Sequence, residues 1–104
     1  MVFSISVLLK QELPLENEDE TIWEEDIILC YADCIEEAKS KAEIVARNLE
    51  VEYKSLSCEI VKWVYDSILS IYQLEENNVS DGSILFARHL RNREVCSLKE
   101  KFSD

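Results

Sequence analysis

The stretch 59–74 constrains the fold more than any other part of the chain. It is rich in β-branched and aromatic residues and contains neither glycine nor proline. This composition favours an extended strand over a helix. The alternation of side chains around Trp63 is lost after Asp66-Ser67, which predicts a bulge or bend that redirects side chains within a long strand. Such a strand needs partners on both edges and cover on at least one face.

The remaining segments predict one small α+β domain at residues 1–90. The expected elements, in order, are a strand at 2–9, an acidic loop at 10–20, a strand at 21–32, a helix from 33 to about 48–50, a connection at 51–58, the strand at 59–74, a turn at 75–82, and a strand at 83–90. This β-β-α-β-β order predicts a four-stranded, mostly antiparallel sheet with one helix packed on one face. Residues 91–104 are expected to form a charged tail or a short helix.

The expected helix has a start signal and an apolar stripe. Asp33 and Glu36 have the spacing of a capping box, in which the two side chains bond free amides of the first turn. The stripe that should face the sheet recurs at spacings of three and four. Its members are Ile35, Ala38, Ala42, Val45 and Leu49.

Charge excludes two classes of partner. The 104 residues include 22 acidic and 11 basic side chains, for a net charge of −11. Binding to nucleic acid or to anionic lipid depends on cationic groups, so neither is an expected partner. An acidic surface instead favours a basic protein partner. No apolar run approaches the roughly 20 residues of a membrane span, and no export signal precedes the first strand, so a cytoplasmic protein with reduced thiols is expected.

Several short motifs occur in a fixed order along the chain. They are Trp23-Glu24-Glu25, Ala32-Asp33 followed by Glu36-Glu37-Ala38-Lys39-Ser40-Lys41-Ala42, Tyr53-Lys54 followed by Glu59-Ile60-Val61-Lys62-Trp63, and Asp81-Gly82. In this order the chain resembles, over roughly residues 2–90, a small bacterial family known as domain of unknown function 4288. It departs from the family pattern at Ser55 and Cys58, where the family usually has Asn and Gly, and near Ile84, where a Glu is common. The resemblance implies a fold and a bacterial cytosolic setting, and it transfers no catalytic residue.

The residues that carry catalysis or bind metal are sparse. His89 is the only histidine, and a nucleophile normally needs a base beside it. Cys30 and Cys34 form one loose pair, while Cys58 and Cys96 are single, so the spacing does not match a structural zinc site. The single Gly82 cannot supply a phosphate-binding loop. The sequence therefore predicts no enzyme, no catalytic residue, no metal and no cofactor.

The most favoured function is a small acidic, non-enzymatic module that binds another protein. An inhibitor or immunity-type protein that masks a basic partner is one version of it. A structural homodimer and a small-ligand-binding domain are the alternatives. Large aromatic side chains mark the candidate interface, namely Trp23, Trp63 and Tyr72.

The face of the sheet that the helix does not cover is also expected to be apolar. Residues 27–32 are apolar on both parities, although one helix can cover only one face. Exposure of the other face would exceed the few hundred Å² that monomers normally tolerate. Val95, Leu98 and Phe102 of the tail offer too little apolar area to cover it. We therefore expect self-association through this face as a two-fold dimer.

Overall fold

The protein is described by a computed structural model that covers residues 1–14, 21–75 and 78–100. Its elements are β1 (Val2–Glu12), β2 (Trp23–Tyr31), α1 (Ile35–Asn48), β3 (Val51–Lys54), β4 (Ile60–Gln73) and α2 (Asn92–Glu100). The α+β class is confirmed. The loop predicted at 10–20 starts later than expected, because residues 10–12 extend β1; residues 15–20, with the acidic run, lie outside the described residues.

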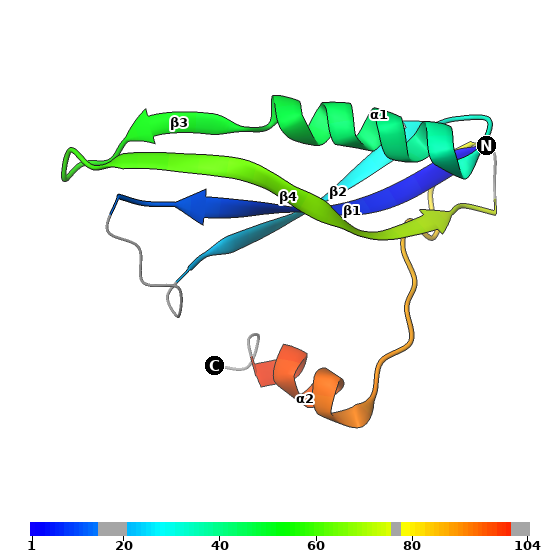
Figure 1. Cartoon of the computed structure of the whole chain (residues 1–104). Helices are drawn as coiled ribbons and strands as arrows, with labels where there is room; N and C mark the ends of the chain where they lie inside the picture. The colour runs from blue at the N-terminus through cyan, green and yellow to red at the C-terminus, as the bar shows by residue number, and fades with distance from the viewer. Residues whose placement is uncertain (15–20, 76–77, 101–104) are drawn as a thin grey trace.

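The four strands form one antiparallel, curled sheet in the order β2-β1-β4-β3 (Figure 1). β1 and β4 occupy its centre, so the long strand predicted at 59–74 does have a partner on each edge. Helix α1 lies along one face of the sheet, which we call the helix face. We call the opposite face the second face.

Two bulges interrupt the pairing of β4 with β1, where the sequence predicts one bulge or bend after Asp66-Ser67. Ser6 lies opposite Ser70 and Val7 opposite Ile68, which leaves Leu69 without a partner in β1. Asp66 is left over in the same way. Side chains alternate strictly between the two faces of a strand, so each extra residue changes which of the following residues point to the helix face. Ile68 and Ile71 can therefore both pack against the core.

Alanines bring α1 close to the sheet. The buried residues of α1 are Ala38, Ala42 and Ala46, and they contact a core that includes Phe3 and Ile5 of β1. The predicted stripe was wrong in its larger members, because Ile35, Val45 and Leu49 remain substantially exposed at the borders of the helix. Only small side chains fit directly between the helix backbone and the sheet.

The start of α1 also differs from the predicted capping box. The N-cap residue is Cys34, and it makes no side-chain cap hydrogen bond. The backbone N–H of Asp33 instead donates to Glu37 at 3.1 Å. The third helical residue thus accepts the bond that was assigned to Glu36, because the helix begins one residue later than the spacing suggested.

The identity of the fourth strand was also predicted incorrectly. Residues 51–54, expected to be a connection, form β3 and pair with β4 as an antiparallel hairpin. Residues 83–90, expected to be a strand, have no regular secondary structure. The edge beside β4 is already taken by β3, so no sheet position next to β4 remains for the later segment. The predicted turn at Asp81-Gly82 is confirmed, with Gly82 at φ +87° and the Ser83 N–H donating to Ser80 O at 3.0 Å.

Helix α2 stands apart from the sheet (Figure 1). None of its residues is buried. The radius of gyration is 16.6 Å, whereas a compact domain of this length has about 13 Å. The C-terminal part of the chain therefore extends away from the domain. No helix among the described residues is long and apolar enough to cross a membrane.

Candidate functional site

Four large side chains of β2 form an exposed apolar row on the second face. Residues directly opposite each other in neighbouring strands point to the same face. Because Phe3 and Ile5 point into the core under α1, the alternate residues Ser4 and Ser6 point to the second face. Leu29 lies opposite Ser4 and Ile27 opposite Ser6. We call this row the β2 stripe, and its members are Trp23 (44% exposed), Ile27 (54%), Leu29 (45%) and Tyr31 (54%).

The rest of the second face is better covered. Ser4 and Ser6 of β1 are buried, and the Ser6 hydroxyl donates to the Glu25 carboxylate of β2. Beside them, residues 86–88 face residues 69–72 of β4 and line a hollow of about 220 Å³ with Glu25. The chain itself therefore covers the central strands and leaves β2 open.

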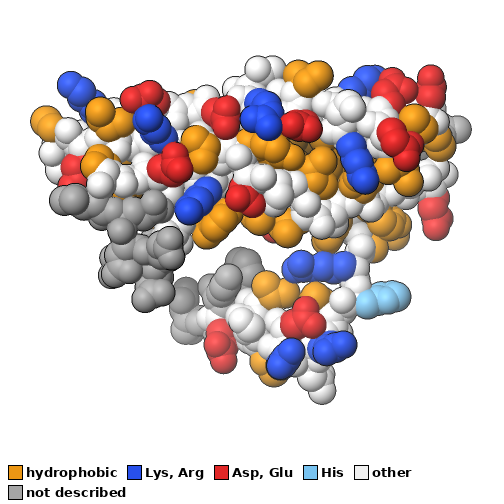
Figure 2. Space-filling model, viewed as in Figure 1, with side chains coloured by type: hydrophobic (Ala, Val, Ile, Leu, Met, Phe, Trp, Pro, Cys, Tyr) orange, Lys and Arg blue, Asp and Glu red, His pale blue; other side chains and the backbone are white. Residues whose placement is uncertain are grey.

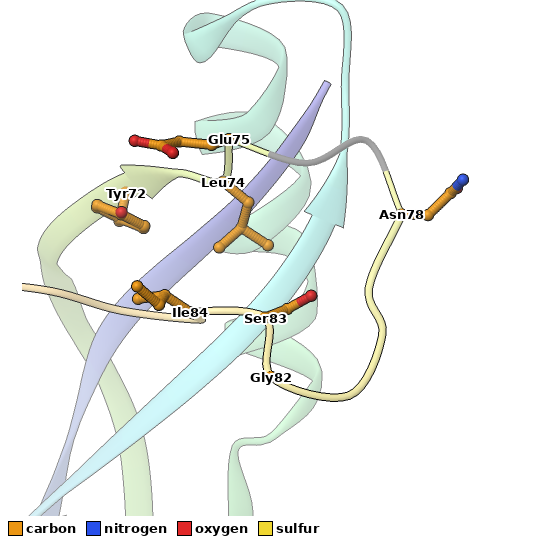
Figure 3. A pocket seen from close by; sticks show the side chains of 7 residues that line it. All are labelled: Tyr72, Leu74, Glu75, Asn78, Gly82, Ser83 and Ile84. Atoms are coloured by element: carbon orange, nitrogen blue, oxygen red, sulfur yellow. The ribbon is translucent and has the colours of Figure 1, made fainter.

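A second hollow lies where β4 ends (Figure 3). Tyr72 and Leu74 face Ile84 across a space of about 160 Å³, and Gly82 closes the turn below it. Pockets for small ligands usually measure about 300–1,000 Å³. This hollow is better explained as the packing of the C-terminal segment on β4 than as a ligand site.

The structure separates the three predicted interface residues. Trp23 belongs to the β2 stripe, and the Lys10 ammonium lies 5.7 Å from the centre of its ring. Tyr72 is also on the second face, opposite Ser4, but it lines both hollows in the centre of the sheet. Trp63 shares the helix face with Tyr65, and its Nε1 donates to Tyr53 Oη at 3.4 Å. Trp63 therefore lies on the opposite face from Trp23, and its hydrogen bond joins the two strands of the β3–β4 hairpin.

Three consecutive acids adjoin the stripe on β2. Glu24 and Asp26 share the helix face, and Glu25 faces the other way. A hydrogen bond with Asp26, and then the negative charge of Asp26, raise the pKa of Glu24 above its ordinary value. Glu24 is nevertheless exposed, so water remains free to solvate it. A catalytic acid pair instead needs a closed cleft that holds the two pKa values apart.

The other candidate groups do not assemble into a site. Among residues 1–14, 21–75 and 78–100, no three His, Cys, Asp or Glu side chains lie close enough to hold a metal ion. The four cysteines are all free thiols; Cys30 is buried, and the other three are exposed. Desolvation raises the pKa of Cys30, although the nearby Lys41 charge partly opposes this effect. His89 is exposed in the segment before α2.

Comparison with known proteins decides the family. The family profile described as Domain of unknown function (DUF4288) matches residues 2–87. The chain belongs to this family. The matched residues include the whole sheet and α1 and stop before α2. No curated protein and no solved structure shows significant similarity to the chain.

This DUF4288 domain thus presents the β2 stripe as a prominent surface, and the predicted interface residues include only part of it. Trp23 is one of them, whereas Ile27, Leu29 and Tyr31 are not. The signal that could have found them was the apolar character of residues 27–31 on both parities. It showed that an apolar face existed, but not that β2 would be an edge strand left open by α1.

Proposed function

We propose that this chain is a non-enzymatic protein-binding module and that the β2 stripe is its binding surface. The observation that carries the proposal is the exposure of four large side chains in one row, each between 44% and 54%. Burying exposed apolar area stabilises a complex by roughly 25 cal/mol per Å² before the costs of association are counted. Aromatic residues such as Trp23 and Tyr31 are also enriched at protein interfaces.

The charge distribution favours a basic partner surface. The net charge is −11, and Glu24, Glu25 and Asp26 lie within the same strand as the stripe. A partner with Arg or Lys around an apolar centre would match both features. This chemistry suits an inhibitor or immunity-type protein that masks a basic partner, and it also suits a second copy that offers a basic segment.

A cytoplasmic setting belongs to the same proposal. It is supported by four free cysteines, because free thiols persist where the compartment is reducing. A small-ligand-binding role at Tyr72 has less support, since the hollow there is smaller than an ordinary ligand pocket.

The test compares what two forms of the purified chain retain from an extract of the native host. One form is the wild type, and the other carries Ile27→Glu and Leu29→Glu, which place charges in the stripe. Ile44→Glu is the matched control, because Ile44 is 63% exposed on α1, outside the second face.

We expect the wild type and the control to retain the same protein, including further copies of the chain, and the stripe variant to lose it. Identical retention by all three forms, with far-UV circular dichroism showing all three folded, would contradict the proposal.

A further inference from the structure

The C-terminal segment exposes apolar surface of its own. We call residues 83–100 the arm; it contains α2 and the irregular segment before it. Ile84 is 64% exposed, and Leu85 and Leu90 are also exposed. In α2, Val95 and Leu98 lie on one side at a spacing of three residues and are only partly covered. One chain thus carries two unburied apolar surfaces, the arm and the β2 stripe.

Helix α2 needs packing to be stable. It has nine residues, and isolated helices shorter than about 12–15 residues are marginal in water. The described part of its own chain does not provide that packing, because α2 lies away from the sheet. Glu94 accepts the Arg91 N–H at 3.3 Å, but one local bond does not replace tertiary contacts.

Charge distinguishes the arm from the domain. Residues 83–100 contain four Lys or Arg and two Asp or Glu, whereas residues 1–82 contain six and nineteen. Three of the four arginines lie close together at Arg88, Arg91 and Arg93. Figure 2 shows basic side chains beside hydrophobic ones on the lower part of the molecule, over α2 and the segment that leads to it. A basic, apolar arm therefore complements an acidic domain with an apolar stripe.

We propose that two copies of this chain exchange arms, so that helix α2 of each arm lies on the β2 stripe of the other copy. This inference rests on the proposed function and names its partner as a second copy. A two-fold dimer requires that surface A of one copy meets surface B of its partner and the reverse. The arm and the stripe meet this requirement, because each chain offers one of each. Residues 86–88 lie beside β4, and the irregular residues 89–91 that follow lead to α2, which lies away from the sheet. These residues provide the reach for exchange.

The arm lies largely outside the matched family residues 2–87. Arm exchange is therefore a property of this chain and not one inferred from the family. The stripe belongs to the matched domain, and the helix that covers it is supplied by the additional segment.

A cross-link between native Cys96 and a cysteine placed in the stripe tests the exchange directly. Cys96 is exposed on α2. Leu29→Cys puts a second thiol on the stripe, in a background with Cys34→Ser and Cys58→Ser. Cys30 is buried, so it does not compete. We expect mild oxidation to give a covalent dimer whose peptides join positions 29 and 96. A matched variant with Ile44→Cys in place of Leu29→Cys should give no link to Cys96.

Two results would overturn the exchange. A 29–96 link found only within single chains would show that the arm folds onto its own sheet. Absence of any 29–96 link, with protein that is folded by circular dichroism, would show that the arm does not reach the stripe.

Mixing two variants provides an independent test. Ile27→Glu with Leu29→Glu spoils the stripe, and Val95→Glu with Leu98→Glu spoils the arm. Each variant alone should be a monomer. Their mixture should form a heterodimer, because one wild-type arm still meets one wild-type stripe. An arm variant that remains a dimer by itself would overturn the exchange, since the copies would then pair by another surface.

These outcomes separate the exchange from the proposed function. A monomeric wild type that still retains a foreign basic protein through the stripe would end the exchange and leave the binding function in place. Retention that is unchanged in the stripe variant would contradict the binding function itself.

Discussion

Cys58 holds the turn between β3 and β4 in a backbone conformation that glycine adopts more readily. Its φ is +66°, and its N–H donates to Ser55 O at 2.9 Å. A left-handed conformation costs an L-residue roughly 1–2 kcal/mol, and glycine avoids this cost. Glycine also has a larger conformational entropy in the unfolded chain, which offsets part of the gain. Cys58→Gly should therefore raise the free energy of unfolding by about 0.5–1 kcal/mol.

Denaturant titration of the wild type and of Cys58→Gly measures this difference. Gly82→Ala is the opposite control. Gly82 has φ +87°, and an added Cβ would meet nothing within 4 Å. Any loss of stability in Gly82→Ala would therefore come from the backbone conformation alone. An unchanged or lower stability of Cys58→Gly would contradict the strain assigned to this turn.

The acids of β2 predict a pH-dependent effect. Asp26 raises the pKa of Glu24 above its ordinary value, so ionisation of Glu24 is less favourable in the folded chain than in the unfolded one. This penalty is absent below the ordinary pKa and is complete above the raised one. Glu24→Gln should therefore raise the melting temperature at neutral pH, and the gain should vanish toward about pH 4. A gain of equal size at both pH values would rule out the electrostatic cause.

At the scale of elements, the fold depends on how closely α1 approaches the sheet. Ala42 is fully buried on the side of α1 that faces the sheet. A larger side chain at this position would push the helix away from the sheet. Ala42→Leu should destabilise the chain by about 1–3 kcal/mol through overpacking. Ile44→Leu, on the exposed side of the same helix, should change stability by less than about 0.5 kcal/mol. Equal effects of the two substitutions in thermal unfolding would show that α1 does not pack as described.

Strands with strong local patterns were predictable from the sequence, and their partners were not. The approximate bounds of β4 followed from composition, and an irregularity in it followed from the loss of alternation after Asp66, although the structure has two bulges there. β3 has only four residues, all exposed, so no apolar pattern identified it. Residues 83–90 alternate as a strand would, yet the position beside β4 is occupied by β3. Local pattern sets the potential to form a strand, but competition for sheet edges decides which segment pairs.

The same limit applied to the candidate site. Side-chain size selected Trp23, Trp63 and Tyr72, but which face each occupies depends on register. Trp63 lies on the helix face, whereas Trp23 and Tyr72 lie on the second face. The prediction of an apolar second face could be made from residues 27–32 alone. Its position on an edge strand could not, because this requires the strand order.

Three properties of the whole molecule favour association of two copies. The β2 stripe is open, the arm is unburied, and the chain is more extended than a compact domain of its length. An acidic domain and a basic arm also attract each other, so salt should weaken their association. The proposed exchange would bury the stripe and α2 together.

Sedimentation equilibrium of the full chain at roughly 10–50 µM, a range in which contacts of micromolar affinity are occupied, tests this account most directly. We expect a species of twice the chain mass of 12.1 kDa, and we expect Ile27→Glu with Leu29→Glu to return the single mass while Ile44→Glu does not. A wild type that sediments as a single chain throughout that range would contradict it.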